Sequence, residues 1–337
     1  MPAARLRVPA PRRCAILQRR TKAQRQAERT RIGPLKSTLV KPKTLARYQI
    51  NFERFVRWMR QNSISFPKAP EAADARLERY IEALWECGDP LGHANDAVSG
   101  FIFFVPICKG CLPRAKRLLT AWARSEQPNR APPFLAVTAY AVALYFLRQG
   151  WRDSALFFVL GWETWARPGE LFASRKRDFN FCSNGSFSVA TWSLPLSKSG
   201  QRQGTVETLV IEDPFAVAAL QRYVGNLYPG EMLSKVSGQV HRNRLASALT
   251  ALGLPSSFRW YSLRRGGATS ALRGGKDLGL IRQKGRWLSE KAATIYLNEG
   301  LALLSLRGLQ PKKIQRLVAL ATRLRPGWRT CFRALAR

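Results

Sequence analysis

The stretch RWYSLRRGGATSAL, from Arg259 to Leu272, places two arginines side by side and two glycines directly after them. Arg264 and Arg265 belong to a run that is apolar enough to lie inside a globular core. A buried guanidinium group costs free energy unless an anion meets it. The stretch therefore predicts a place where the folded chain receives an anion, and the rest of the sequence indicates which anion that is.

The composition is that of a folded protein with a strongly basic balance. The chain has 337 residues, of which 46% are hydrophobic, so two domains with cores of their own are expected. Lysine and arginine number 56 against 21 acidic residues, a formal net charge of +35. This excess favours a polyanionic partner, with nucleic acid first and an anionic membrane surface second. A solvated cationic surface is the plainer alternative.

Several classes of protein fit the sequence poorly. No apolar run reaches the ~18 residues that a membrane span needs, so we expect no membrane-spanning segment. The six cysteines are scattered, which favours a reducing compartment. Cys108 and Cys111 form a lone C-x-x-C, and the only histidines are His93 and His241. Two ordinary helix cysteines are favoured over zinc ligands, and we expect neither a metal nor a cofactor.

Both ends of the chain are basic arms. Residues 1–43 carry thirteen Lys/Arg and one acid, Glu28, whereas residues 305–337 carry nine Lys/Arg and no acid. The first arm has little apolar content, so we expect it to be disordered without a partner, although an Arg-rich organelle transit peptide is an alternative. The second arm has apolar residues at helical spacing. Such a basic amphipathic helix suits DNA, a partner chain or a membrane surface.

The body of the chain divides into two parts with different patterns. Residues 44–125 have apolar positions at helical spacing and predict a helical domain of four helices. Residues 126–134, rich in proline and polar residues, are interpreted as a linker. Residues 135–304 are predicted to be helical with two strand-like runs, 186–197 and 204–211, which are joined by a turn. The fold class is therefore mainly α with a small antiparallel β-sheet (α+β).

A first group of charged residues lies where the surrounding sequence is apolar. Arg167 follows the run VLGWETWA, and Glu170, three residues on, is placed to hold its guanidinium group. Lys198 lies at the tip of the predicted hairpin. Arg264 lies at the start of a predicted helix capped by Ser262, and helix N-termini favour anions.

A tyrosine completes the group. Tyr296 lies in a predicted helix with Ser289 as its N-cap, and Ala292 and Ala293 lie one turn back on the same face. Two arginines, a lysine and a phenol are the parts needed to attack a phosphodiester without a metal. The guanidinium groups neutralise the transition state, the lysine protonates the leaving 5′ oxygen, and the tyrosine forms a phosphotyrosyl intermediate. The anion predicted by the opening stretch is therefore a scissile DNA phosphate.

The chain from about 44 to 300 resembles a tyrosine recombinase of the phage-integrase family. The segment GWETWARPGELFASRKRDF resembles the family's first box, which makes Arg167 the first catalytic arginine and Glu170 its follower. Lys198 in LPLSKSG matches the hairpin lysine, and YSLRRGGATSAL resembles the second box, with Arg264 as the second arginine and Arg265 in support. In KGRWLSEKAATIYL, Trp287 takes the place of the family's His or Trp, and the nucleophile Tyr296 follows nine residues later.

The resemblance implies a helical core-binding domain, a tyrosine-recombinase catalytic domain, and cutting and rejoining of double-stranded DNA by dimers or tetramers. One departure concerns Tyr261, which stands where the second box normally opens with His. A phenol can donate a hydrogen bond to a phosphate, but it is a poor proton shuttle at neutral pH. The LRRGGAT form resembles DIRS-like and Crypton-like recombinases of eukaryotic mobile elements, which implies a transposable element and the nucleus. The alternatives are an inactive, domesticated DNA-binding derivative and a basic structural or RNA-associated protein.

Overall fold

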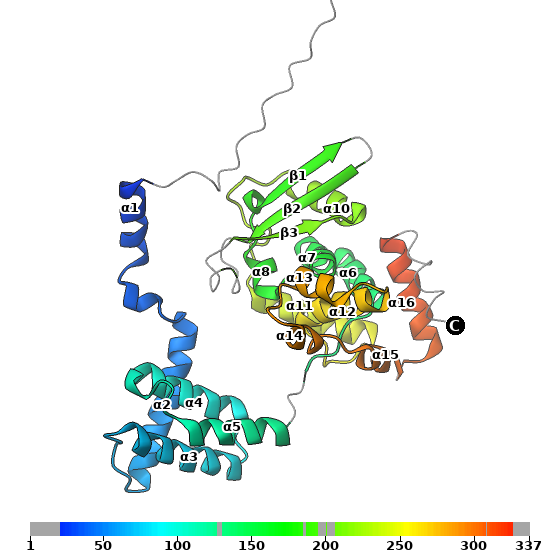
Figure 1. Cartoon of the computed structure of the whole chain (residues 1–337). Coiled ribbons are helices and arrows are strands. Elements are labelled where there is room, and N and C mark those ends of the chain that lie inside the picture. The colour runs from blue at the N-terminus through cyan, green and yellow to red at the C-terminus, as the bar shows by residue number, and fades with distance from the viewer. Residues whose placement is uncertain are drawn as a thin grey trace, which may run out of the picture. The chain divides into compact units, whose positions relative to one another are not determined.

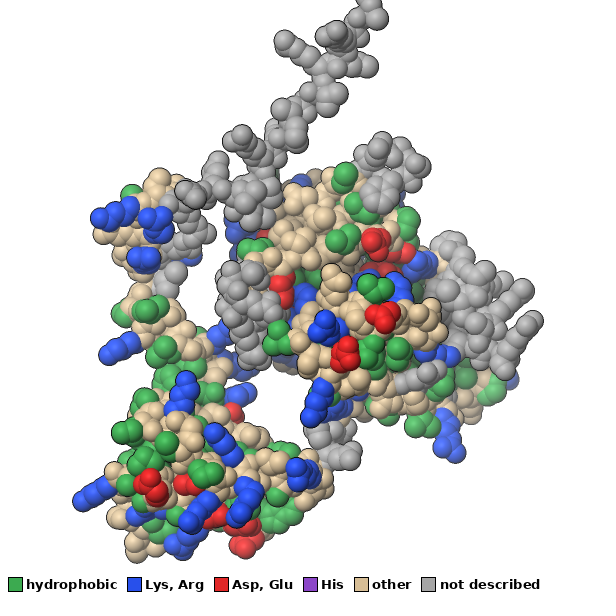
Figure 2. Space-filling view, in the orientation of Figure 1, with side chains coloured by type: hydrophobic (Ala, Val, Ile, Leu, Met, Phe, Trp, Pro, Cys, Tyr) green, Lys and Arg blue, Asp and Glu red, His purple; other side chains and the backbone are tan. Residues whose placement is uncertain are grey.

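The computed structural model describes residues 21–126, 130–184, 187–194, 200, 206–307 and 309–325. Within it the chain divides into two compact units, which we call unit 1 (residues 1–129) and unit 2 (residues 130–337) (Figure 1). Lys and Arg side chains are spread over both units on the face that Figure 2 shows. Among the described residues no helix combines the length and apolar character that crossing a bilayer requires.

Unit 1 is built around four helices, as its apolar spacing predicts. They are α2 (Pro42–Gln61), α3 (Pro70–Glu86), α4 (Leu91–Phe104) and α5 (Pro113–Ser125), with the short 3-10 turn η3 (Pro106–Cys108) between the last two. Their core is apolar and rich in aromatic rings, with Phe55, Leu77, Phe101 and Trp122 among its buried members. The buried carboxylate of Asp74 accepts hydrogen bonds from the first backbone N–H groups of α5, both at 3.0 Å.

The first arm, for which we expect disorder in the absence of a partner, has helical elements in its described part. Residues Lys22–Ile32 form helix α1, and Leu35–Thr38 form the 3-10 turn η2. A capping box starts α1, because the Thr21 hydroxyl accepts from the Gln24 N–H and the Gln24 side chain accepts from the Thr21 N–H. Alanine, glutamine, lysine and arginine are strong helix formers, so a helix forms here without an apolar face to bury. Residues 1–20 lie outside the described residues.

Unit 2 is a helical body with one small sheet. Its elements, in chain order, are α6 (Ala136–Arg148), α7 (Arg152–Thr164), α8 (Pro168–Ala173), η4 (Lys176–Asp178), β1 (Phe179–Asn184), β2 (Phe187–Leu194), β3 (Glu207–Ile211), α10 (Pro214–Val224), α11 (Gly238–Leu252), α12 (Tyr261–Arg273), α13 (Leu278–Gly285), α14 (Glu290–Thr294), α15 (Glu299–Arg307) and α16 (Pro311–Leu324). Together with unit 1, this arrangement confirms the predicted mainly α fold with an antiparallel sheet.

The sheet has the order β1-β2-β3 and is antiparallel throughout. Phe179 pairs with Trp192 across β1 and β2, and Ala190 pairs with Ile211 across β2 and β3. All four of these side chains are buried, so this face of the sheet belongs to the core of unit 2. The two predicted strand runs correspond to β2 and β3. The sequence analysis missed β1, whose polar residues weaken the alternation that marks a strand.

Helix α12 is largely buried in unit 2 and lies very close to its neighbours. A Cβ atom on Gly266 would come within 2.3 Å of the Phe134 carbonyl oxygen, and one on Gly267 within 2.6 Å of the Trp162 carbonyl oxygen. No larger residue fits at either position without moving backbone atoms. Gly267 therefore allows the close approach of α12 to α7, and Gly266 allows that of α12 to the segment before α6; in both places it is the chain's own backbone that comes close.

The described part of the second arm, 305–325, is part of unit 2. The buried face of α16, formed by Leu317, Leu320 and Ala321, packs in the same core as α6. Arg325, directly after α16, forms ion pairs with Glu163 and Asp213 and donates a hydrogen bond to the Tyr140 hydroxyl. The apolar face of this amphipathic helix is therefore occupied within the same unit, which the sequence alone could not decide.

Candidate functional site

The first site residue, Arg167, lies at the N-terminus of α8 and is held by a carboxylate. Its Nη1 donates to Glu170 Oε1 at 2.8 Å, and its backbone N–H donates to Glu170 Oε2 at 2.8 Å. Proline at position 168 starts the helix in the manner that proline favours. About a fifth of the Arg167 side chain stays exposed, 22%, so its guanidinium group can reach a ligand from solvent while Glu170 fixes its direction.

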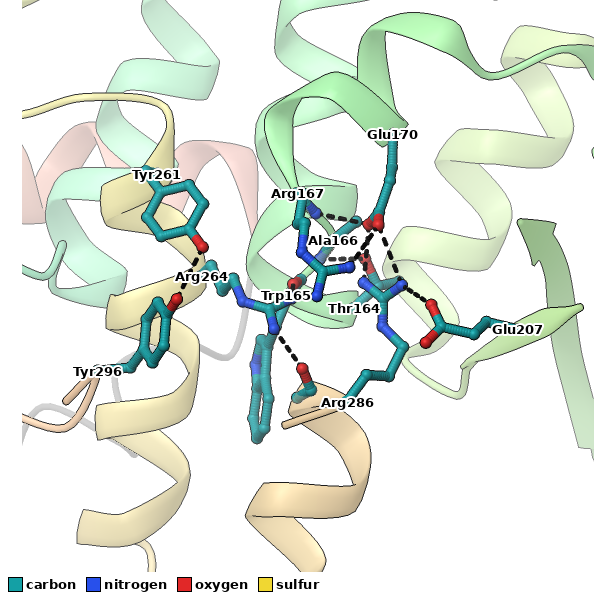
Figure 3. A network of polar contacts seen from close by, with 11 residues as sticks. Thr164, Trp165, Ala166, Arg167, Glu170, Glu207, Tyr261, Arg264, Arg286 and Tyr296 are labelled. Atoms are coloured by element: carbon teal, nitrogen blue, oxygen red, sulfur yellow. Dashed lines mark hydrogen bonds and ion pairs between the residues drawn. The ribbon is translucent and has the colours of Figure 1, made fainter. Parts of the chain in front are cut away.

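Arg286, which the sequence analysis missed, holds this carboxylate in place and is itself paired with Glu207, which the sequence analysis also missed. Arg286 donates to Glu170 Oε2 at 2.7 Å and to Glu207 Oε2, on strand β3, also at 2.7 Å (Figure 3). Burial alone raises the pKa of Glu170, but hydrogen bonds and charge from Arg286 and Arg167 outweigh it and hold the pKa below its usual value. The only signal in the sequence is that Arg286 adjoins Trp287, because Glu207 is remote in the chain.

The second site residue, Arg264, is fully enclosed, with 1% of its surface exposed. Its Nη1 donates to the Trp165 carbonyl oxygen at 2.6 Å, and its Nη2 donates to the Gly285 carbonyl oxygen. The guanidinium group also lies 4.7 Å from the centre of the Trp287 ring, a cation–π contact. Burial and the charge of Arg167 lower the pKa of Arg264 to about 10, so Arg264 still carries its charge at neutral pH.

Both loops that meet Arg264 use a left-handed backbone at a residue other than glycine. Trp165 ends α7 with φ 53°, and Arg286 ends α13 with φ 54°. This conformation costs roughly 1–2 kcal/mol for an L-residue, and such strain concentrates at functional sites. At Trp165 it turns the carbonyl oxygen towards Arg264, and at Arg286 it turns the chain so that the next residue, Trp287, packs on the same guanidinium group.

The two tyrosines of the site face each other. The hydroxyl oxygens of Tyr261 and Tyr296 lie 3.0 Å apart, within hydrogen-bond distance (Figure 3). The Tyr296 ring lies 4.8 Å from the Trp287 ring and 5.6 Å from the Arg264 guanidinium carbon. Burial and the hydrogen bond with Tyr296 raise the pKa of Tyr261 to about 12. The Tyr261 phenol is therefore a proton donor at neutral pH and not a base.

Two local expectations about these helices are wrong. Ser289 caps α14 as predicted, accepting from the Ala292 N–H at 3.2 Å, but α14 ends at Thr294 and Tyr296 lies in the turn that follows. Ser262 does not cap α12, because the helix already begins at Tyr261. The Ser262 hydroxyl instead accepts from the Arg259 N–H at 3.0 Å, which fastens the chain just before the helix.

The remaining predicted residues have different positions. Trp287 is 9% exposed, and its indole Nε1 has no hydrogen-bond partner in the described structure. Arg265 is buried next to Arg264, with 4% of its surface exposed. Lys198 falls between β2 and β3, outside the described residues. The described site thus brings together Arg167, Arg264, Trp287 and the tyrosine pair from four separate segments of unit 2.

This arrangement of groups is suited to an oxyanion. The guanidinium groups of Arg264 and Arg167 are held in fixed directions by carbonyl and carboxylate oxygens, and the phenols supply hydroxyl groups beside them. Fixed donors of this kind stabilise developing negative charge without first having to reorganise. The described residues contain no group of three His, Cys, Asp or Glu side chains that could hold a metal ion.

The chain has the fold of the tyrosine recombinases. Three of the solved structures that match it have low sequence identity to this chain. The Tn1549 transposon integrase with transposon right end DNA matches with a TM-score of 0.54 and 14% identity, over 83% of this chain and 95% of that chain. The same integrase with circular intermediate DNA matches with a TM-score of 0.52 and 16% identity, over 88% of this chain and 97% of that chain. The XerH site-specific recombinase in a post-cleavage complex with palindromic difH substrate matches with a TM-score of 0.52 and 13% identity, over 82% of this chain and 78% of that chain. No family model and no curated protein matches the sequence.

Proposed function

We propose that this protein cuts and rejoins double-stranded DNA through a covalent link between Tyr296 and a 3′ phosphate. The Tyr296 oxygen attacks the phosphorus atom, a phosphorus–oxygen bond to the tyrosine forms, and the bond to the 5′ oxygen breaks. The phenol proton is lost to solvent and the leaving 5′ oxygen takes up a proton, which we assign to Lys198 as donor. Attack by a 5′ hydroxyl on the phosphotyrosine reverses these steps and rejoins a strand.

In this proposal each described side chain has one role. Arg167 and Arg264 donate to the non-bridging oxygens of the phosphate and neutralise the charge that grows on them. Tyr261, as a protonated phenol, donates to the same phosphate or to the oxygen of Tyr296. Trp287 packs on both Arg264 and Tyr296, and so it keeps the attacking group beside the cation that binds its target.

One observation carries the proposal. The Tyr296 ring lies 5.6 Å from the guanidinium carbon of Arg264, although the two residues belong to different elements and are 32 positions apart. A tyrosine beside a buried, oriented cation is the minimum arrangement for attack on a phosphodiester, because the cation attracts the phosphate to the nucleophile. The recombinase fold of the chain supports the same conclusion, as do neighbours whose structures contain DNA.

The experiment is a covalent trapping assay. The protein is incubated with duplex DNA that carries a nick beside the cleavage position, so that the short 5′ fragment diffuses away and rejoining fails. A protein–DNA band that survives a denaturing gel supports the proposal, and mass spectrometry of the adduct should locate the nucleotide on Tyr296. A library of random duplexes replaces a single substrate, because the recognised DNA sequence is unknown. Loss of the band after substitution of Tyr296 by Phe is the necessary control.

A second candidate function is binding to DNA without cleavage, as in an inactive or domesticated derivative of a transposon recombinase. The observation in its favour is Tyr261, whose phenol, with its pKa raised to about 12, cannot accept a proton at neutral pH. Specific retention of DNA without any adduct would support this candidate. As finer parts of the main proposal we retain assembly into dimers or tetramers on DNA, a DIRS-like or Crypton-like mobile-element origin and a nuclear location, with an organelle as the alternative.

A further inference from the structure

Arg265 is a buried cation for which the described structure offers no counter-charge. Only 4% of its surface is exposed, and its Nε atom is buried without a hydrogen-bond partner. No carboxylate is among the groups that influence its pKa, which burial and the charge of Arg130 lower. A buried guanidinium nitrogen without an acceptor is costly, on the order of the 1–3 kcal/mol of an unsatisfied buried polar group.

The Nε atoms of Arg264 and Arg286 are likewise buried without a partner, but the terminal nitrogens of the other enclosed arginines of unit 2 have oxygen acceptors, unlike those of Arg265. Arg286 contacts Glu170 and Glu207, both at 2.7 Å, and Arg244 contacts Asp153 at 2.8 Å. Arg264 donates to two backbone carbonyl oxygens. At all three of these arginines the fold itself supplies oxygen acceptors for the terminal nitrogens. Arg265 lacks them, which is the state expected of a group whose acceptor arrives with a ligand.

The surroundings of Arg265 indicate the charge of that ligand. Its electrostatic neighbours are a second arginine, Arg130, and the phenols of Tyr296 and Tyr261. Arg130 is exposed, and its Nη1 donates to the Ile295 carbonyl oxygen at 3.3 Å, one residue before Tyr296. Two cations therefore lie beside the tyrosine pair with no acid between them, and only an anion lowers their mutual repulsion.

This anion position is distinct from the one formed by Arg264. Successive residues of a helix are rotated by about 100° from each other, a consequence of 3.6 residues per turn, so Arg264 and Arg265 leave α12 in different directions. Tyr261 lies three positions before Arg264 and four before Arg265, and so each arginine lies on one side of it. The guanidinium group of Arg264 is also fixed by the carbonyl oxygens of Trp165 and Gly285.

We propose that Arg265, assisted by Arg130, binds a second phosphate of the DNA strand, adjacent to the phosphate that Tyr296 attacks. The inference rests on the proposed function, because it takes the ligand at Tyr296 to be a DNA backbone. Two phosphates held on opposite sides of the tyrosine pair fix the position of the strand along its length. Arg265 is thus a positioning residue, which sets where the scissile phosphate stops in front of Tyr296.

The test removes the charge of one phosphate at a time. Nicked duplexes carry a single methylphosphonate, which is uncharged, at one of the positions flanking the cleavage site, and the rate of covalent adduct formation is measured. At one flanking position we expect the substitution to slow wild-type protein by about tenfold or more, the value of one charge-assisted hydrogen bond. The Arg265→Gln variant should have a slower rate on unmodified DNA and less than about twofold further loss at that position.

Two other variants complete the design. Arg282→Gln removes a charge from an exposed residue of α13 and should keep the full sensitivity of the wild type to the methylphosphonate. Arg130→Gln removes an exposed side chain without affecting the core, and it should reduce that sensitivity even if Arg265→Gln fails to fold. If wild-type protein forms no adduct on unmodified DNA, the proposed function is wrong. If it forms the adduct but the wild type and both the Arg265 and Arg130 variants respond equally at every flanking position, the second phosphate site is wrong.

Discussion

The two units of this chain differ in where they place their arginines: the described arginines of unit 1 are exposed or half-buried, whereas some of those in unit 2 are buried. Among the described residues of unit 1 the buried polar side chains are Asn51 and Asp74, whereas unit 2 buries Arg264 and Arg265 as well as several hydroxyl groups. The arginines of unit 1 that form ion pairs remain largely in solvent, such as Arg117 at 80% side-chain exposure. Exposed cations attract a polyanion at little cost to folding, but buried ones are retained only where they do chemistry or are neutralised.

The largest effect that this contrast predicts is at the nucleophile. Substitution of Tyr296 by Phe should abolish the covalent adduct, while DNA affinity changes by less than about threefold, under ~1 kcal/mol, because exposed cations supply the affinity. Gel-shift titration and the trapping assay measure the two quantities. Tyr228, which is 80% exposed, provides the matched Phe substitution and should leave both unchanged. An adduct that persists in the Tyr296 variant would remove the tyrosine from the mechanism.

The next largest effect should be a loss of stability when the buried ion pairs of Glu170, Arg286 and Glu207 are broken. Glu170→Gln leaves Arg286 and Arg167 without their shared carboxylate, and we expect it to lower the free energy of unfolding of unit 2 by about 3 kcal/mol. Glu207→Gln is the matched control and should cost less, because Arg286 keeps its contacts with Glu170. Urea denaturation followed by tryptophan fluorescence measures both values. Equal losses in the two variants would contradict a central role for Glu170.

Loss of the Tyr261 hydroxyl should have a smaller effect on the rate of adduct formation, and this effect should not depend on pH over the neutral range. Removing its hydroxyl in Tyr261→Phe should slow adduct formation by ~10²-fold, as for one lost donor. With its pKa raised to about 12, the phenol stays protonated, so the ratio of wild-type to Phe rates should be constant from pH 6 to 9. Stability linked to this group is complete below pH ~10 and is lost as the pH rises towards 12.

Replacement of Tyr261 by His introduces at this position a donor that does titrate near neutral pH. This variant should be active, and its rate should fall as the pH rises through ~6.5, because the imidazolium loses the charge that attracts the phosphate. Wild-type protein should have no such change. A wild-type rate with an inflection near neutral pH would mean that another group titrates in the site.

The exposed cations of the N-terminal arm should have the weakest effect on chemistry. Deletion of residues 1–40, which ends before α2 begins, should weaken DNA binding and flatten its salt dependence, since each phosphate contact contributes about 0.9 to the log–log slope. Covalent cleavage at low salt should survive. An unchanged slope would mean that the arm does not touch DNA, and the charge of unit 1 would then need another explanation.

Chelation should have no effect at all. Arg167 and Arg264 supply the positive charge that a divalent metal supplies in other phosphoryl-transfer enzymes. We therefore expect the adduct to form at the same rate in excess EDTA. Loss of the adduct on chelation, with recovery on adding magnesium, would show that the two arginines are not sufficient.

The sequence predicted the parts of this molecule that depend on local pattern. Apolar spacing located the helices of unit 1, and alternating apolar residues located β2 and β3. The pair of Arg167 and Glu170 also follows from sequence, because three residues of separation across a helix start bring the two groups together. The ends of helices depend on weaker local signals. Tyr296 lies just beyond α14 because the helix lasts only five residues, and no residue type marks that end.

The sequence does not predict which residues that are far apart in the chain contact each other in the fold. Arg286 and Glu207 are 79 residues apart, and nothing in either neighbourhood indicates that they touch. The same is true of the two carbonyl oxygens that orient Arg264, since every residue has a carbonyl group and only the folded backbone aims it. The contact between the hydroxyls of Tyr261 and Tyr296 likewise depends on how α12 and the turn after α14 meet.

The packing of α16 limits where the polypeptide can be truncated without exposing the core of unit 2. A fragment that ends at residue 304 would match the catalytic segment expected from sequence, yet it would strip Leu317 and Leu320 from the core and leave Glu163 and Asp213 without Arg325. Such a fragment would present an uncovered apolar surface and would tend to aggregate. Residue 325 is therefore the earliest sensible end point for producing unit 2 by itself, and a protease-resistant core ending earlier is not expected.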